Sequence, residues 1–498
     1  MNKLTGQVFT PDYLVDNILN YSGYGGSGIL RRHSMDNSCG DGAFLCAMVK
    51  RYCQEFLSVS KDNRLLKREL ETFFHGIDKD PVACHRCKSN LDDALAAYGI
   101  SNVRWDIVNA DALLVTKYDN KMDFVIGNPP YVRIHNLEGS YGEVRLFNFT
   151  KSGMTDLYLA FFEKGINMLR PGGYLCYVTP NSWIHSVAGS GLRDYISSMK
   201  CLKEVVDIGH FQPFNATTYT MITLLQKDHS FDSIWYYSYD GERKERKFVD
   251  DLAYEDAFIN GQLFLGRKQT LDDYRKIVTS HPNHYVQVKN GFSTQTDNVF
   301  IQDRFDFTEM TIPVLKGSTG QWRKAFFPYN SQGKPYSKEE IFSHCRIAEW
   351  LESNKDSILR GRSERDYPYW YLYGRTQALG DVNKYKISIN TIIKDVDTVK
   401  LSAVDAGKGV YSGLYILGSR DYPLVSSILR SQEFVDFVAL MKTYKRGGYF
   451  AFRAKDVETY LNYMIDKRIR DGEVAVSSPL APLNIVSKDT RQLSLLRI

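Results

Sequence analysis

The stretch DFVIGNPPY occupies residues 123–131 and organises the rest of the chain. Its apolar start predicts a buried strand. Pro129 and Pro130 stop that strand because proline fixes φ and lacks an N–H donor. Open α/β sheets bind their ligands at the carboxyl ends of the strands. The motif therefore places the Asn128 side chain and two backbone carbonyls at a ligand-binding edge of a sheet.

These groups form a rigid cluster of hydrogen-bond acceptors beside the ring of Tyr131. Such a cluster suits a planar amine, which it grips through the N–H groups and stacks against the ring. An exocyclic amine is a poor nucleophile because its lone pair is conjugated. Acceptors on both hydrogens favour the pyramidal form, so the motif indicates chemistry at an amino nitrogen.

Length and composition indicate a soluble globular protein with about two to four domains. The chain has 498 residues, of which 43% are hydrophobic and 24% are charged. It contains no apolar run of about 18 residues and no apolar signal core at its start, so we expect a cytoplasmic protein without a membrane span. The net charge of +5 by itself argues only weakly for a nucleic-acid partner.

Cysteine spacing predicts neither a disulfide framework nor a metal site. The eight cysteines are scattered along the chain, and the CxxC at Cys84 and Cys87 has no second pair at zinc spacing. We expect these two residues to be ordinary helix residues.

The segment FTPDYLVDNIL, residues 9–19, predicts a helix with apolar positions on one face. Thr10 is a good capping residue, and Pro11 suits the first helical position. Taken alone, the segment indicates an ordinary capped helix.

A glycine-containing turn follows a short predicted strand that ends near Asp36. The turn reads SCGDG at residues 38–42, and a helix is expected after it. Glycines there let the backbone approach a ligand closely, and a helix N-terminus is electropositive. A lone G-x-G is a weak signal, but the acids that follow strengthen it.

Two of those acids come after the next predicted strands. Asp78 ends a strand over residues 73–78, where a doubly wound sheet places a ribose-binding carboxylate. Asp111 follows a strand over residues 103–108 and is positioned to accept a hydrogen bond from an adenine amino group. Read separately, Asp78 is also typical of a solvated strand end, and Asp111 is typical of a turn.

The remaining first half continues the alternation of strands and helices. A helix over 156–169, ended by the glycines of PGG at 171–173, precedes a strand at 174–178. A helix near 191–198 and strands at 205–208 and 219–225 follow, and the polar loop 132–152 is of the kind that orders over a ligand. Alternation across residues 34–227 predicts a doubly wound, mostly parallel α/β sheet.

After residue 227 the pattern changes to shorter, aromatic-rich elements, so we expect a second domain of mixed α+β structure over 228–498. Basic and aromatic residues interleave in YPYWYLYGR, which ends at Arg375, and in KTYKRGGYF, which contains Lys445 and Arg446. Such segments can place phosphates and stack bases, so these three residues are candidates for DNA binding. Most of the aromatic residues are expected to be core.

Taken together, the motifs resemble the γ-class DNA adenine-N6 methyltransferases of restriction–modification systems, the TaqI-like group. The resemblance covers residues 5–227 and rests on the order of the TP segment, the glycine turn, the two acids and NPPY. It implies a Rossmann-like fold that uses S-adenosylmethionine (AdoMet), followed by a C-terminal target-recognition domain. One departure is Asn37, which stands where the family usually has proline.

The resemblance also implies residue roles. Asn128 and the Pro129 carbonyl would hold the target amine, with Pro130 completing the motif and Tyr131 stacking on a flipped base. A second stacking ring is expected before the strand at 219–225, with Phe214 first and Phe211 next. The cofactor residues implied are Thr10, Asp36, Ser38, Cys39, Gly40, Gly42, Asp78, Asp111 and Asn128.

The implied substrate is double-stranded DNA with a specific recognition sequence, and the implied protein is a bacterial monomer that acts apart from any cognate endonuclease. Protein glutamine methyltransferases and RNA adenine methyltransferases share NPPY, but a large second domain argues against both. A binding-only protein is disfavoured by the intact Asn128 and Tyr131, and N4-cytosine methylation by asparagine at position 128.

Overall fold

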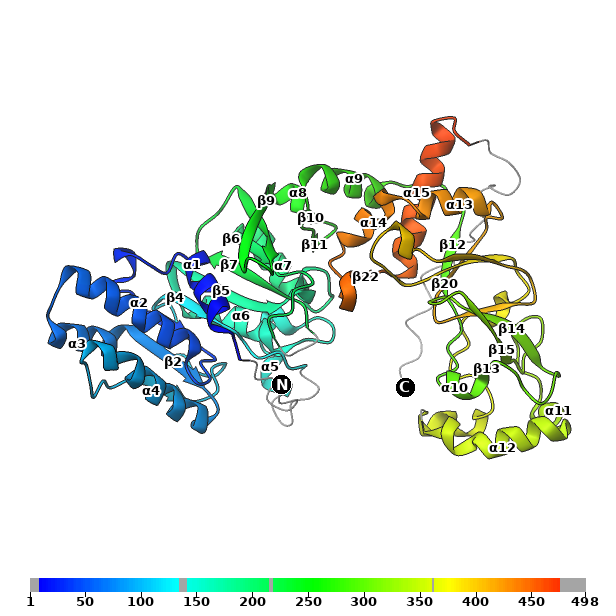
Figure 1. Cartoon of the computed structure of the whole chain (residues 1–498), viewed down its shortest axis with the longest axis horizontal. Helices are drawn as coiled ribbons and strands as arrows, with labels where there is room; N and C mark the ends of the chain where they lie inside the picture. Colours follow the sequence, from blue (N-terminus) through cyan, green and yellow to red (C-terminus); the bar gives the residue numbers. More distant parts are fainter. Residues whose placement is uncertain (1–8, 134–140, 215–217, 361, 475–498) are drawn as a thin grey trace. The chain divides into compact units, whose positions relative to one another are not determined.

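The computed structural model describes residues 9–133, 141–214, 218–360 and 362–474. The chain divides into two compact units, Met1–Asp272 and Asp273–Ile498 (Figure 1). Among the described residues, we find no helix that combines the length and apolar character needed to cross a membrane.

The first unit is built on a nine-stranded sheet with the order β3-β2-β1-β4-β5-β7-β6-β8-β9. Strands β1 to β5 are parallel, as are β6 and β8, whereas β7 and β9 run antiparallel to their neighbours. The expected α/β class with a mostly parallel sheet is therefore confirmed. The bounds are β1 Ser34–Asp36, β2 Phe74–Asp78, β3 Asp106–Asn109, β4 Met122–Gly127, β5 Leu169–Pro180, β6 Leu202–Asp207, β7 Thr220–Gln226, β8 Ser233–Asp240 and β9 Glu245–Ala253.

The strand order reverses beside β1. From there, β2 and β3 extend the sheet in one direction, and β4 and β5 extend it in the other. Such a switch point leaves a crevice at the carboxyl ends of the two central strands. Asp36 ends β1, and Asn128 directly follows β4, so both predicted site residues lie at this crevice.

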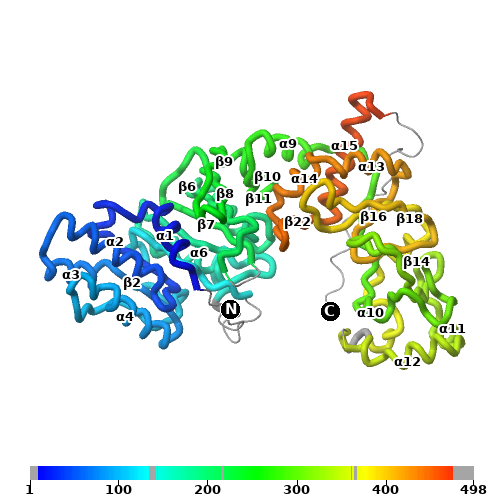
Figure 2. The backbone as a smooth tube through the Cα atoms, in the orientation of Figure 1, coloured from blue at the N-terminus to red at the C-terminus, as the bar shows by residue number. Residues whose placement is uncertain are grey.

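Helices cover both faces of the sheet (Figure 2). On one face, α1, α2 and α4 share a core with alternate residues of β4 and β5, such as Ile126 and Val178. On the other face, α6 packs against Tyr177, whose ring lies 5.4 Å from that of Phe162. The bounds are α1 Asp12–Tyr21, α2 Ala43–Val59, α3 Asn63–Phe73, α4 Pro81–Leu95, α5 Tyr141–Val144, α6 Leu157–Met168, α7 Ser190–Met199 and α8 Tyr254–Ala257.

Two local expectations differ from the structure. Helix α1 begins at Asp12 with Pro11 as its N-cap, so the expected capping role of Thr10 is wrong. The Pro-Gly-Gly segment at 171–173 lies within β5, where the pairing with β4 shifts register between Met122 and Phe124. Helix α6 has already ended at Met168, so the Pro-Gly-Gly segment does not end it. The segment instead forms an irregular start to a long strand.

The boundary between the units lies later than the expected position between residues 227 and 228. Strands β8 and β9 extend the first sheet, because β8 pairs in parallel with β6. A short hairpin of β10 (Phe258–Ile259) and β11 (Gln262–Leu263) follows in the same unit. The aromatic residues of β8 had suggested a change of domain, but they continue the first sheet instead.

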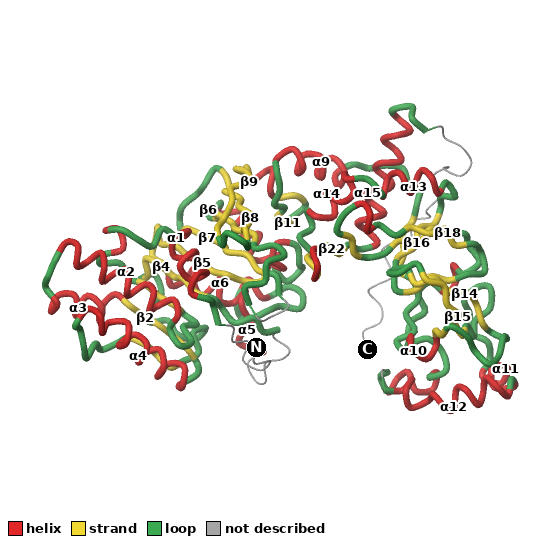
Figure 3. Tube along the Cα trace, in the orientation of Figure 1, coloured by secondary structure: helices red, strands yellow, loops and turns green. Residues whose placement is uncertain are grey.

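The second unit contains three small sheets with helices around them (Figure 3). Their orders are β12-β20-β16-β18, β13-β15-β14-β19 and β17-β22-β21. The strands are β12 Gln287–Asn290, β13 Ile301–Gln302, β14 Thr311–Lys316, β15 Gln321–Phe326, β16 Lys386–Ile389, β17 Ile392–Ile393, β18 Leu401–Val404, β19 Gly409–Tyr411, β20 Leu414–Leu417, β21 Tyr444–Lys445 and β22 Tyr449–Ala451. The helices are α10 Asp297–Phe300, α11 Lys338–Ser343, α12 Cys345–Leu359, α13 Tyr422–Leu429, α14 Gln432–Ala439 and α15 Ala454–Arg470, and α9 (Lys268–Thr279) spans the boundary between the units.

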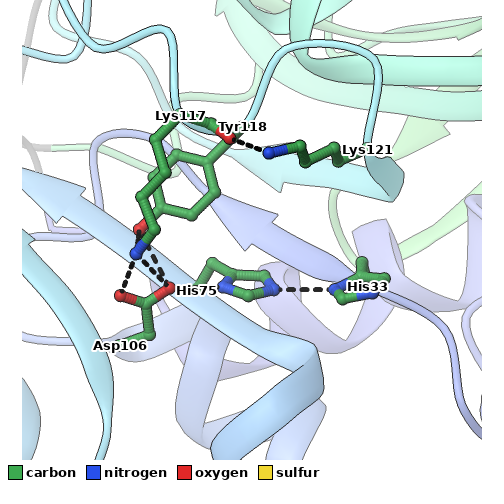
Figure 4. A network of polar contacts seen from close by, with 6 residues as sticks. All are labelled: His33, His75, Asp106, Lys117, Tyr118 and Lys121. Atoms are coloured by element: carbon green, nitrogen blue, oxygen red, sulfur yellow. Dashed lines mark hydrogen bonds and ion pairs between the residues drawn. The ribbon is translucent and has the colours of Figure 1, made fainter.

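A polar network occupies the opposite end of the parallel strands from the crevice (Figure 4). His33 Nδ1 lies 2.9 Å from His75 Nε2, and His75 Nδ1 lies 2.8 Å from an Asp106 oxygen. Asp106 also accepts hydrogen bonds from Lys117 and Tyr118. Burial by itself would raise the pKa of Asp106, but these hydrogen bonds outweigh it and hold that pKa below its ordinary value. The ionised carboxylate joins β2 to β3 and to the chain that leads into β4.

We expect Asp106→Asn to destabilise the fold by about 1–3 kcal/mol at pH 7, because charged hydrogen bonds of this size are lost. A carboxylate with a lowered folded pKa stabilises the fold above its unfolded pKa and loses that contribution as the pH falls through the folded value. The difference between wild type and variant should therefore stay constant from pH 7 down to about pH 4 and shrink below it. Urea unfolding across this range measures it, and an unchanged midpoint at pH 7 would contradict the network's role.

Candidate active site

A cavity opens at the switch point and collects most of the predicted site residues. Its lining comes from the segment before α1, the turn after β1, and the ends of β2, β3 and β4. Of the predicted residues, it includes Thr10, Asp36, Ser38, Cys39, Gly40, Asp78, Asp111, Asn128 and Pro130. Residues more than a hundred positions apart are thus brought to one site by the parallel pairing of the strands.

Asp36 is the most deeply buried acid of the cavity, with 2% of its surface exposed. It accepts a hydrogen bond from the Ser38 N–H at 3.0 Å. Burial and the nearby charge of Asp78 raise the pKa of Asp36 to about 7, although the Ser38 N–H partly offsets them. A Cβ at position 127 would lie 2.6 Å from the Asp36 carboxylate, so the close approach of β4 to this acid requires glycine there.

The turn after β1 is tied to β2 through Asp78. Gly40 N–H donates to one Asp78 oxygen at 2.9 Å, and Asp80 N–H donates to the other at 2.9 Å. Gly42 lies outside the cavity lining, because it is the N-cap of α2 and its Cα faces Cys87. The first turn of α2 contributes Ala43 and Phe44 to the cavity, so an electropositive helix end faces it.

Asp111 is a turn residue that also lines the cavity. Its side chain accepts from the Leu113 N–H at 3.0 Å, which makes it a turn residue, and it also lines the cavity. Leu113 lines the same cavity. The turn therefore aims one acid and one apolar side chain into the crevice.

The NPPY motif lies at the strand edge as expected. Asn128 Nδ2 donates to Thr10 Oγ1 at 3.1 Å, and the Asn128 carbonyl accepts from Ser38 Oγ at 3.3 Å. Pro130 lines the cavity, whereas Pro129 is buried and outside the lining. The motif is thus in direct contact with the segment before α1 and with the turn after β1, both of which line the cavity.

The ring of Tyr131, the last residue of the motif, contacts the ring of Phe214. The two rings are not parallel, so they do not form a slot for a base between them. Their ring centroids lie 6.4 Å apart at 82°, an edge-to-face contact. Tyr131 is anchored by its hydroxyl, which donates to the Val178 carbonyl at 3.0 Å, and Phe214 is 5% exposed. Phe211 instead stacks on Tyr239, so Phe214 is the ring that the structure brings to Tyr131.

Several apolar lining residues were not assigned to the site from sequence. They are Phe9, Phe44, Leu113, Val144, Leu157 and Phe161. The helical periodicity around Phe161 had indicated only a core position, because periodicity identifies an apolar face without saying what packs against it. Asn37, which also lines the cavity, accepts a hydrogen bond from the buried Tyr177 hydroxyl at 2.8 Å.

The candidate DNA-binding residues lie in the second unit and are exposed. Lys445 ends β21, Arg446 follows it, and a tight turn with positive φ at Gly447 and Gly448 leads into β22. The Lys394 side chain lies against Gly448, which adds a third cation beside this turn. Arg375 lies on a separate loop, whose Gly374 N–H donates to the Thr294 carbonyl.

The family comparison falls on the segment that builds this site. Residues 51–214 match the Eco57I restriction-modification methylase family. The matched methylase segment holds Asp78, Asp111, NPPY and Phe214, and it covers about a third of the chain. The expected resemblance to methyltransferases of restriction–modification systems is confirmed.

Curated relatives extend the similarity to both units. The type II restriction enzyme and methyltransferase RM.Eco57I of Escherichia coli is 23% identical over 91% of this chain and 56% of its own length. The type II methyltransferase M.BstVI of Geobacillus stearothermophilus is 29% identical over 45% of this chain and 42% of its own length. M.PaeR7I of Pseudomonas aeruginosa is 25% identical over 90% of this chain and 84% of its own length. The chain thus spans about half the length of the first two relatives and most of the third.

Solved structures share the fold along most of the chain. The type IIL restriction-modification enzyme MmeI, determined in complex with DNA, has a TM-score of 0.62 and 12% identity, over 89% of this chain and 63% of that chain. A nuclease-deletion mutant of the type ISP enzyme LlaGI has a TM-score of 0.54 over 93% of this chain and 47% of its own. At this identity the likeness establishes the fold, and it includes the second unit.

We expect Asp36→Asn to stabilise the ligand-free protein at pH 8 by about 1–2 kcal/mol. Substitutions that remove a destabilising group from a functional site commonly have an effect of this size. An acid with a raised folded pKa favours the fold at low pH and loses that contribution as the pH rises from about 4 towards about 7. Asparagine keeps the acceptor for Ser38 and removes the buried charge. Urea unfolding at pH 5 and pH 8 tests this, and an equal pH response in the two proteins would contradict the burial argument.

Proposed function

We propose that this chain is a DNA methyltransferase of a restriction–modification system. It transfers the methyl group of AdoMet to the N6 amino group of an adenine that has been flipped out of duplex DNA. The observation that carries the proposal is the contact between the Asn128 amide and the wall of the acidic cavity, which joins an amine-binding motif to a cofactor site.

The cavity fits AdoMet by its charge and its shape. Five aspartates line it, against Lys79 as the one Lys or Arg among the described lining residues. An acidic cavity suits a ligand that carries a sulfonium and an ammonium group. Asp36 would meet the cationic end of the ligand, Asp78 the ribose hydroxyls, and Asp111 the adenine amino group, with Leu113 and Phe161 against its apolar surfaces.

When bound, AdoMet supplies an electrophilic methyl group on a cationic sulfur. The chain's own task is to position the nucleophile, because a well-oriented amine needs no strong base and proximity supplies much of the rate. The Asn128 amide oxygen and the Pro129 carbonyl accept the two amine hydrogens and favour the pyramidal nitrogen. Tyr131, whose hydroxyl is tied to Val178, offers its ring as a fixed stacking surface.

An adenine inside a duplex cannot reach a cavity of this kind, so base flipping belongs to the proposal. The edge-to-face contact of Tyr131 and Phe214 implies that one ring moves when a base enters. Phe214 is the candidate, because Tyr131 is anchored by its hydroxyl, whereas Phe214 packs within an apolar cluster.

Protein glutamine and RNA adenine methylation are the alternatives that share NPPY. The second unit supports DNA, since it is a compact unit with exposed basic residues on a turn, and the restriction-modification enzyme MmeI, which shares the fold along most of the chain, was determined in complex with DNA. Methyl transfer to a duplex, a matched RNA and a glutamine peptide, followed by sequencing that reads modified bases, separates the three.

We expect Asn128→Ala to lower the methyl-transfer rate by more than about tenfold, a barrier change above 1.4 kcal/mol, with AdoMet affinity nearly intact. Asp78→Ala should instead weaken AdoMet binding by about 1–3 kcal/mol through lost ribose hydrogen bonds. Calorimetric titration and a single-turnover assay measure both. Asp106→Asn is the matched control, since it lies at the opposite end of the strands and should alter stability alone. A rate loss under tenfold for Asn128→Ala would refute its assigned role.

Lys445→Ala and Arg446→Ala should weaken DNA binding and reduce its dependence on salt, because each phosphate contact releases counterions on binding. Lys355→Ala is the control, because this partly buried lysine of α12 is paired with Glu352 and lies over the Trp370 ring. Binding measured at several salt concentrations decides the matter. Equal salt slopes for all three variants and wild type would remove the turn from the DNA interface.

A further inference from the structure

The contact between Thr10 and Asn128 joins two segments that lie 118 residues apart. Asn128 Nδ2 is the donor and Thr10 Oγ1 the acceptor, at 3.1 Å, and Thr10 is 9% exposed. The Thr10 hydroxyl is therefore engaged with the amine-binding residue rather than with the start of α1, whose N-cap is Pro11.

Thr10 is held firmly enough to act on its neighbour. A residue before proline is restricted to extended conformations, and Pro11 imposes this on Thr10. Helix α1, which follows, is anchored by Leu14, Val15, Ile18 and Leu19, each at most 2% exposed. From the other side, Ser38 Oγ donates to the Asn128 carbonyl and so holds the motif's backbone.

The orientation of the Asn128 amide matters because its two ends have opposite polarity. The oxygen accepts hydrogen bonds and the nitrogen donates them. An amine to be methylated presents N–H donors, so a nitrogen aimed at it would repel it. Tying Nδ2 to an acceptor on one side turns Oδ1 towards the other side of the amide group.

We propose that Thr10 is a positioning residue that fixes the Asn128 amide with its oxygen towards the substrate amine. This rests on the proposed function, in which Asn128 holds the amine. It differs from the role implied by the family resemblance, which places Thr10 among the cofactor-binding residues. The two roles predict different effects of substituting Thr10. Loss of the amide's orientation lowers the methyl-transfer rate, whereas loss of a cofactor contact lowers the affinity for AdoMet.

Thr10→Val and Thr10→Ser form a matched pair, because valine keeps the shape and loses the hydroxyl, whereas serine keeps the hydroxyl and loses a methyl group. In a single turnover on duplex DNA at saturating AdoMet, we expect Thr10→Val to be about tenfold slower, which corresponds to the loss of one hydrogen bond that orients Asn128. Thr10→Ser should restore most of the rate. AdoMet affinity and melting temperature should stay close to wild type in both variants.

A double-mutant cycle tests whether Thr10 acts through Asn128. In an Asn128→Ala background, Thr10→Val should cause no further loss of rate. An equal tenfold loss in that background, a fall in AdoMet affinity that matches the rate loss, or a Thr10→Val protein at full rate would each overturn the proposal. A wild-type protein that methylates no adenine in DNA would overturn the proposed function and the Thr10 role together, so the two failures are distinguishable.

Discussion

The parallel pairing of β1 with β4 is the constraint on which the site depends. It sets Asp36 against Gly127 so closely that a single methyl group at position 127 would collide with the carboxylate. Because β1 is also the strand where the order reverses, this contact lies at the crevice. Asp36 and Asn128 are therefore neighbours through the sheet itself, and a shift in register would separate them.

In this arrangement, a group that lowers the stability of the fold lies at the carboxyl ends of the strands, and groups that raise its stability lie at the opposite ends. At the carboxyl ends of the strands, a buried acid is kept where its charge is disfavoured, with its pKa raised to about 7. At the opposite ends, Asp106 and Asp123 are both satisfied by cations and hydrogen bonds from neighbouring segments. The buried acid of the cavity and the hydrogen-bonded acids thus lie at opposite ends of the strands. Substitutions at the two ends should therefore have separable effects.

The second unit contributes a different kind of surface. Its small sheets are joined by loops and helices, and the candidate DNA-binding residues Arg375, Lys445 and Arg446 are exposed. Loops on a rigid scaffold can vary without unfolding it. That suits a part whose task would be to choose among DNA sequences, while the proposed methyl transfer would take place in the first unit.

The sequence by itself determined the class of the first unit and most of its site. The alternation of strands and helices predicted the parallel sheet, and NPPY, Asp36, Asp78 and Asp111 predicted the cavity, because acids and glycines at strand ends are local signals. Only the tertiary structure decided where the first sheet ends. Strands β8 and β9 are not distinguished from the strands of the second unit by their composition, and only their pairing, of β8 with β6 and of β9 with β8, assigns them to the first sheet. The tertiary structure also decided that Thr10 contacts Asn128 instead of capping α1, and that Tyr131 and Phe214 meet at a right angle. These are contacts between distant segments, and a side chain's local preference cannot specify which distant partner reaches it.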